Sequence, residues 1–216
     1  QFLPKAPMDE DKMVKEIMGY IKKIGNMKLY TLTKHLFEAN VEKLKIYPAA
    51  SKNHHEYVSG LAYHTLSMLK IAESLLNIYP QLNANLVYAG IVLHDLGKTV
   101  ELSGPVVPTY TLEGKLLGHI SIAQSMINEA AKELNIEGEE VILLQHMILS
   151  HHGKNEFGSP VLPQIQEAEI VYFIDNIDAR MNMFDKALDQ VDYADYSKRI
   201  FALENRMIYK PKMYED

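Results

Sequence analysis

The segment Ile91–Lys98 (IVLHDLGK) places a histidine and an aspartate directly after an apolar run. A carboxylate that leaves water destabilises a protein unless it is paired or coordinated. His94 and Asp95 therefore need partners from elsewhere in the chain. Neutral imidazole and carboxylate groups are both ligands for divalent cations, so a metal site is one chemistry that would satisfy them together.

Four further residues of ligand type lie on apolar faces or at the ends of predicted helices: His64, His119, His151 and Asp175. Core packing would explain any one of these histidines taken alone. Six such residues on five predicted helices would each lose stability if they were left unpaired. Metal sites in helical bundles are built from inward-facing side chains of different helices, so the pattern indicates a cluster around divalent cations.

Most of the chain has the hydrophobic periodicity of helices. The pattern predicts helices within residues 9–25, 32–48, 60–80, 83–98, 114–134, 137–153 and 164–184, and an amphipathic helix over 196–209. The helix at 83–98 is apolar nearly all round, which favours a central position, and Gly97 is expected to end it. Pro and Gly predict an irregular loop or short hairpin at 102–114 and a loop at 153–164. The predicted fold is an all-α orthogonal helical bundle.

Composition limits the remaining possibilities. The 216 residues, 47% of them hydrophobic and 23% charged, suit one domain (1–216) with its core at about 50–190 and helical extensions at both ends. A net charge of -6 means that any nucleic-acid contact needs a local basic patch. The absence of cysteine excludes disulfides and thiolate ligands and fits a cytoplasmic protein. No apolar run approaches the roughly 20 residues that span a membrane, so we expect no membrane partner.

The candidate ligands resemble the motifs of the HD-domain metal-dependent phosphohydrolases. They occur in the order H…HD…H…H…D of the dinuclear members: His64, His94, Asp95, His119, His151 and Asp175. The resemblance implies that one cation is bound by four residues: His64, His94, Asp95 and Asp175. It implies a second cation on His119 and His151, with Asp95 bridging the two. A metal-bridging hydroxide would then attack a phosphodiester. The resemblance favours Mn or Co for activity, and the ligand types also allow Fe, Ni or Zn.

Longer stretches are similar to the C-terminal domain of the YhaM-type bacterial 3′-to-5′ exoribonucleases: NHHEYVSGLAYHTLSML, YAGIVLHDLGK and LSHHGKNEFGSP. This resemblance implies hydrolysis of single-stranded RNA from its 3′ end, with DNA as an open second substrate. That family carries an N-terminal OB-fold domain, which these residues, starting at Gln1, do not contain. The alternative is a nucleotide phosphohydrolase acting on small nucleotides, because the same six ligands serve both reactions. A non-catalytic sensor is a third reading, which the complete ligand set disfavours. A homo-oligomer is also left open.

Two residues near the ligands are predicted to contact the substrate. The HDxGK pattern of the family predicts that Lys98 is catalytic and reaches a phosphate oxygen. The alternative is a helix-end lysine that faces water. His152 follows a predicted ligand and is expected to touch a substrate phosphate or to support a ligand.

Other residues have two open interpretations. Arg180 would serve equally as a phosphate clamp or in a structural ion pair. Tyr110 and Phe157 lie in the predicted loops, where base stacking competes with ordinary packing. His54 and His55 precede the predicted helix of His64 and are interpreted as surface loop residues. The alternative is that both face the cavity of the metal site.

Overall fold

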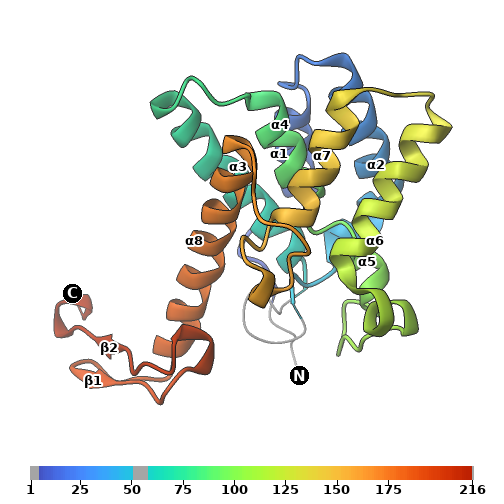
Figure 1. Cartoon of the computed structure of the whole chain (residues 1–216). Coiled ribbons are helices and arrows are strands. Elements are labelled where there is room, and N and C mark those ends of the chain that lie inside the picture. The colour runs from blue at the N-terminus through green and yellow to red at the C-terminus, as the bar shows by residue number, and fades with distance from the viewer. Residues whose placement is uncertain (1–4, 51–57, 216) are drawn as a thin grey trace.

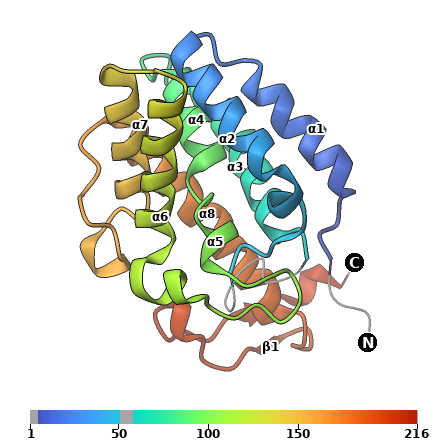
Figure 2. The same ribbon diagram turned by 90° about the vertical axis from the view of Figure 1, so that its right-hand side faces the viewer.

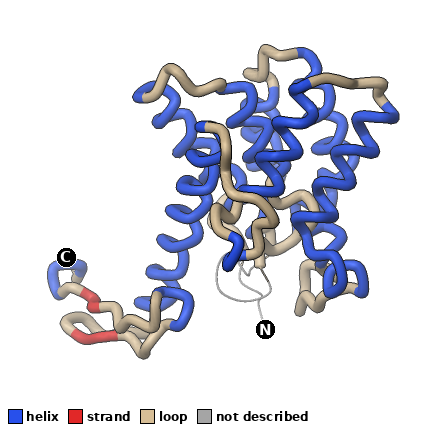
Figure 3. The backbone as a smooth tube through the Cα atoms, viewed as in Figure 1, coloured by secondary structure: helices blue, strands red, loops and turns tan. Residues whose placement is uncertain are grey.

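The structure is a computed structural model that describes residues 5–50 and 58–215. Its helices are α1 (Glu10–Ile21), α2 (Met27–Ile46), α3 (Gly60–Ile78), α4 (Ala84–Leu93), α5 (Lys98–Glu101), α6 (Leu112–Glu133), α7 (Glu139–Ser150) and α8 (Gln166–Leu188). Single 3-10 turns follow at η1 (Asn155–Phe157), η2 (Phe201–Leu203) and η3 (Lys212–Tyr214), with short strands β1 (Asp195–Tyr196) and β2 (Tyr209–Lys210). Figures 1 and 3 show a helical bundle, which confirms the predicted all-α fold.

Helix α4 lies at the centre of the bundle. Its N-terminus is capped by the side chain of Asn83, which accepts from the backbone N–H of Asn85 and Leu86. All residues from Leu86 to Leu93 are buried. The helix packs against α1, α2, α3, α7 and α8, as Figure 2 illustrates from the side. The chain that leaves α4 therefore enters the interior, at a point that several helices reach.

The prediction that Gly97 ends this helix is wrong. Helix α4 ends at Leu93, and Gly97 has the right-handed helical φ of -59°. A side chain is excluded there for another reason: a Cβ on Gly97 would lie 2.0 Å from the carbonyl oxygen of His119. Gly118 adopts a φ of 72° and breaks α6 immediately before His119. The two glycines together allow the backbones of the α4–α5 turn and of α6 to touch.

A Gly97→Ala variant is expected to lower the free energy of unfolding by about 1–3 kcal/mol, because the added methyl group overpacks a backbone contact. Urea denaturation followed by circular dichroism measures the change. Gly19 is the matched control, since a Cβ there meets nothing within 4 Å. Gly19→Ala should stabilise the protein by about 0.5–1 kcal/mol through helix propensity. Equal stability of the Gly97→Ala variant and the unchanged protein would contradict the proposed contact.

The loop after α5 closes as a short hairpin, within the range of the prediction. Leu102 and Tyr110 form an antiparallel bridge, and the Ser103 N–H donates to the Thr109 carbonyl at 2.9 Å. The loop thus returns the chain to the start of α6. No helix in the described parts of the chain is both long and apolar enough to cross a membrane.

The predicted helix over 196–209 is not formed. Strands β1 and β2 pair in antiparallel register instead, with η2 between them. Glu204 and Asn205 have left-handed φ values of 53° and 58°, which reverse the chain where a helix would continue. We call residues 189–215 the C-terminal arm. Figure 1 shows that it follows α8 away from the main body of the bundle.

Candidate metal centre

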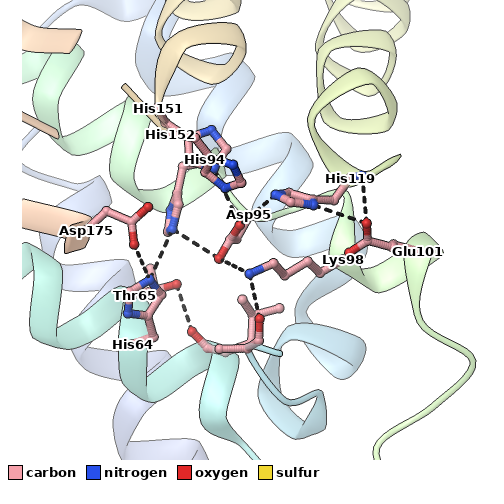
Figure 4. A network of polar contacts seen from close by, with 12 residues as sticks. His64, Thr65, His94, Asp95, Lys98, Glu101, His119, His151, His152 and Asp175 are labelled. Atoms are coloured by element: carbon pink, nitrogen blue, oxygen red, sulfur yellow. Dashed lines mark hydrogen bonds and ion pairs between the residues drawn. The ribbon is translucent and has the colours of Figure 1, made fainter. Parts of the chain in front are cut away.

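Five elements bring the six predicted ligands to one place inside the bundle. Figure 4 shows the side chains directed toward one another. The residues come from α3, the turn after α4, α6, the C-terminus of α7 and α8: His64, His94, Asp95, His119, His151 and Asp175. His64, His94 and His151 have no exposed surface, and Asp95 is only 3% exposed. The fold therefore places four of the six side chains almost out of contact with solvent, while those of His119 and Asp175 stay 14% and 16% exposed.

One half of the cluster lies between α3, α4 and α8. The Nε2 atoms of His64 and His94 are 3.4 Å apart. His64 Nε2 is 3.1 Å from Asp175 Oδ1, and His94 Nε2 is 3.2 Å from Asp95 Oδ2. The ligand atoms of His64, His94 and Asp175 all lie within 4.8 Å of one another. This donor set of nitrogen and oxygen atoms fits one divalent cation.

The other half is built around the second oxygen of Asp95. Asp95 Oδ1 lies 3.5 Å from His119 Nε2 and 3.7 Å from His151 Nε2. These three atoms are buried and have no hydrogen-bond partner among the described residues. Buried polar atoms without partners are rare because each one destabilises the fold. A cation between them would satisfy all three atoms, and Asp95 would then serve both halves.

The model of the HD domain family matches residues 61–180, which contain all six candidate ligands. The chain belongs to the HD-domain family. It is 55% identical over 210 residues to the 3′-5′ exoribonuclease YhaM of Geobacillus sp. (strain WCH70). The alignment covers 97% of this chain and 65% of that relative, so the chain spans somewhat less than two thirds of the relative's length. No solved structure matches the chain.

Carboxylates behind the ligands fix two of the imidazoles of this HD domain. His64 Nδ1 is 2.6 Å from Asp178 Oδ2. Glu101 Oε1 lies 3.2 Å from His119 Nδ1 and accepts the backbone N–H of His119 at 3.0 Å. A proton on Nδ1 directs the lone pair of Nε2 toward the cluster and increases its basicity.

Neither Asp178 nor Glu101 was among the residues predicted from the sequence. Asp178 follows Asp175 by three residues on α8, so helical spacing was a signal for it. Glu101 had no such signal, since its contact with His119 joins two separate helices. His94 and His151 use backbone partners instead: the Nδ1 atoms lie 2.7 Å from the carbonyl oxygens of Ile91 and Ile148 respectively.

The first half of the cluster holds a proton when no cation is bound. Burial lowers the pKa of His64, but hydrogen bonds with Asp175 and Asp178 outweigh burial and raise this pKa to about 10. Burial raises the pKa of Asp175, but His64 holds this pKa well below its usual value. The metal-free HD domain therefore places an imidazolium between two carboxylates. A cation must displace this proton, so metal binding is expected to release protons and to weaken as the pH falls.

Lys98 is buried and points at the shared ligand, which rules out the alternative of a lysine facing water. Its Nζ donates to Asp95 Oδ2 at 2.7 Å and to the Ala49 carbonyl at 2.5 Å, and the residue is 7% exposed. Burial lowers the pKa of Lys98, but the negative charge of Asp95 outweighs burial and raises it. The HD domain thus holds a permanent positive charge beside the cluster.

His152 also lies beside the cluster, although adjacent residues of a helix point about 100° apart. Helix α7 ends at Ser150, so the helical divergence of neighbouring residues no longer applies. The ring of His152 is 4.4 Å from that of His151 and 5.2 Å from that of His119, centroid to centroid. Burial, with the nearby charge of His151, lowers the pKa of His152 to about 4, so this imidazole is neutral near pH 7.

A cavity of about 560 Å³ opens onto the cluster. Asp95, Lys98, His152 and Asp175 contribute to its lining, together with aromatic and charged residues of α8 and of the C-terminal arm. Arg180 lines it too, but its guanidinium pairs with Glu204 through contacts of 2.7 and 2.8 Å. The structure therefore supports the ion-pair interpretation of Arg180.

Of the two aromatic residues considered for base stacking, the structure places only one at the cavity. Phe157 is 55% exposed and lines the cavity. Tyr110 is 47% exposed in the hairpin after α5 and is not part of the lining. His54 and His55 lie outside the described residues.

A Glu101→Gln variant is expected to weaken the binding of one Mn²⁺ by roughly 10- to 100-fold, because His119 loses the carboxylate that orients its ring. Calorimetric titration of the metal-free protein with MnCl₂ measures the affinity. Glu113→Gln is the matched control, since Glu113 is an exposed carboxylate in the first turn of α6. Unchanged affinities in the Glu101→Gln variant would show that Glu101 plays no part in metal binding.

Proposed function

We propose that this HD-domain protein is a divalent-metal-dependent phosphodiesterase that removes nucleotides from the 3′ end of single-stranded RNA. The observation that carries the proposal is the position of Asp95, whose two oxygens face separate sets of buried imidazole nitrogens. Such an arrangement suits a pair of cations that share one carboxylate, as in enzymes that displace groups at phosphorus. The choice of RNA 3′ ends is supported by the 55% identity to the 3′-5′ exoribonuclease YhaM.

The site is proposed to bind two divalent cations. Nitrogen and oxygen ligands without sulfur allow Mn, Fe, Co, Ni or Zn, and the resemblance to the HD-domain phosphohydrolases favours Mn²⁺ or Co²⁺ for activity. When bound, such cations supply an activated water and positive charge for the phosphate. His64, His94 and Asp175 would hold one of them, and His119 and His151 the other, with Asp95 common to both.

Residues outside the ligand set would act on the substrate directly. Lys98 keeps its ammonium at the edge of the cluster, where it would stabilise charge on a phosphate oxygen. His152 is neutral and partly buried in the cavity wall, where it would contact the substrate. Its Nδ1 donates to the Phe157 carbonyl at 2.7 Å, so Nε2 of the neutral ring would accept a hydrogen bond, for example from a ribose hydroxyl group, rather than donate one to phosphate. His64, His94, Asp95 and His151 are buried, which lowers the local dielectric and strengthens these interactions.

The proposal is tested by incubating the metal-free protein with 5′-labelled single-stranded RNA, with and without Mn²⁺. We expect a ladder of shortened 5′-labelled products only in the presence of the metal. The same RNA with a blocked 3′ end is the control and should persist. Mononucleotides and dinucleotides are assayed in parallel. Phosphate release from small nucleotides without any shortening of RNA would overturn the proposal in favour of a nucleotide phosphohydrolase.

A further inference from the structure

The C-terminal arm forms one wall of the cavity that opens onto the metal centre. The floor is made by Asp95, Lys98 and Asp175, which belong to the bundle. Phe201, Ala202 and Glu204 line the same cavity from the arm, in and just after η2. The volume of about 560 Å³ is in the range of small-ligand sites. Any substrate that reaches the metal ligands through this cavity therefore passes the arm.

The side chain of Phe201 is 91% exposed, although the residue belongs to the ordered turn η2. Leu203, two residues further along the chain, is fully buried and anchors the turn. The Ile200 N–H donates to the Arg206 carbonyl at 2.9 Å, which closes the turn at its base. Phe201 thus presents an aromatic face to solvent at the edge of the cavity without being needed for packing.

A second aromatic side chain lines the cavity from η1. Phe157 is 55% exposed, and its carbonyl oxygen lies 2.7 Å from His152 Nδ1. This contact ties the position of Phe157 to the residue that neighbours the ligand His151. Two exposed phenyl rings therefore belong to turns that are each fixed by hydrogen bonds, one in the bundle and one in the arm.

An ion-pair network attaches the arm to α8 at the same cavity. The carboxylate of Glu204 binds the Arg180 guanidinium through both oxygens, at 2.7 and 2.8 Å, and also accepts from Arg206 Nη2 at 2.8 Å. Bidentate arginine–carboxylate pairs fix geometry as well as charge. Two arginines share one carboxylate, so these three residues together carry one net positive charge.

We propose that Phe201 and Phe157 form a base-binding subsite, on which the 3′-terminal bases of single-stranded RNA stack while the phosphate reaches the metal ligands. This inference rests on the proposed function. Aromatic side chains stack on every kind of base, so the subsite would accept RNA of any sequence. The Arg180–Glu204 pair is then a positioning element that holds Phe201 at the cavity.

The subsite is tested with two RNA substrates of equal length, one with ordinary bases and one with abasic 3′-terminal residues. Stacking predicts that Phe201→Ala lowers kcat/KM on ordinary RNA by about 5- to 100-fold. It should leave kcat/KM on the abasic RNA unchanged, and Phe201→Trp should retain the preference for ordinary RNA. Tyr214→Ala is the matched control, since Tyr214 is 61% exposed in the same arm and does not line the cavity.

Equal losses on both substrates in the Phe201→Ala variant would overturn the inference, because Phe201 would then act only through the structure of the arm. A binding measurement separates this outcome from failure of the proposed function. Fluorescence anisotropy of 5′-fluorescein RNA in EDTA reports affinity without hydrolysis. Weaker binding of ordinary RNA by Phe201→Ala supports the subsite even if no RNA is shortened, and equal affinity of the two proteins overturns it.

Discussion

An Asp95→Asn variant is expected to lose RNA hydrolysis and to bind both cations weakly. Asp95 faces His94 with one oxygen and His119 and His151 with the other, so the substitution alters both halves of the cluster. The loss of metal affinity should exceed the roughly 10- to 100-fold that follows from removing a partner behind a ligand. Calorimetric titration with Mn²⁺ and the rate of RNA shortening are the two measurements.

The control for this variant is Glu129→Gln, because Glu129 is an exposed carboxylate on α6 that lies almost three helical turns beyond His119. This change should leave metal affinity and activity unaltered. Full activity of the Asp95→Asn protein would contradict both the shared ligand and the proposed mechanism. Loss of activity with unchanged metal affinity would restrict the role of Asp95 to the chemical step.

A Lys98→Met variant is expected to destabilise the metal-free protein by about 3–5 kcal/mol, because Asp95 would remain buried without its cationic partner. The side chains of the pair are only 9% and 4% exposed, so solvent screens their interaction little. Bound Mn²⁺ would replace the missing positive charge. The deficit in the free energy of unfolding should therefore shrink when urea denaturation is repeated with Mn²⁺ instead of EDTA.

Lys23 provides the matched control for the loss of a lysine. It pairs with Glu73 at the surface, where the side chains are 50% and 44% exposed. Exposed pairs contribute about 0–1 kcal/mol, so Lys23→Met should change stability little and independently of metal. A Lys98→Met deficit that is the same in EDTA and in Mn²⁺ would show that the charge of Lys98 does not compensate Asp95.

The hydrophobic pattern was sufficient to predict the helices that carry or directly precede the candidate ligands, although His94, Asp95 and His151 lie just after α4 and α7 rather than within the helices as predicted. Helix α4 is apolar on all sides, so its central position followed from burial alone, and the position of His94 and Asp95 followed from it. The order of the six ligand types in the chain then indicated the HD-domain family, which the sequence comparison confirms. Their role as ligands stays a prediction that metal titration must test.

Contacts between elements that are distant in the sequence could not be predicted from the hydrophobic pattern. Glu101 reaches His119 only because α5 and α6 pack together, and no local pattern encodes that packing. The residues after α8 have amphipathic spacing, yet left-handed conformations at Glu204 and Asn205 reverse the chain. Leu203 is buried by this turn rather than by a helical face. Periodicity alone does not distinguish these two ways of burying an apolar side chain.

The contact between Gly97 and the His119 carbonyl joins main chain to main chain. Gly118 divides α6, and His119 begins the part after this break. Main-chain atoms do not change rotamer, so no side chain sets the distance between His119 and the turn that carries Asp95. Because Gly97 has no side chain, it lets the main chain that carries Asp95 approach the main chain of His119 directly, which sets the distance between the two halves of the centre. Substitutions that alter the ligand side chains would leave this distance intact, whereas a single methyl group at residue 97 would push against the His119 main chain and lengthen the distance without changing any ligand side chain.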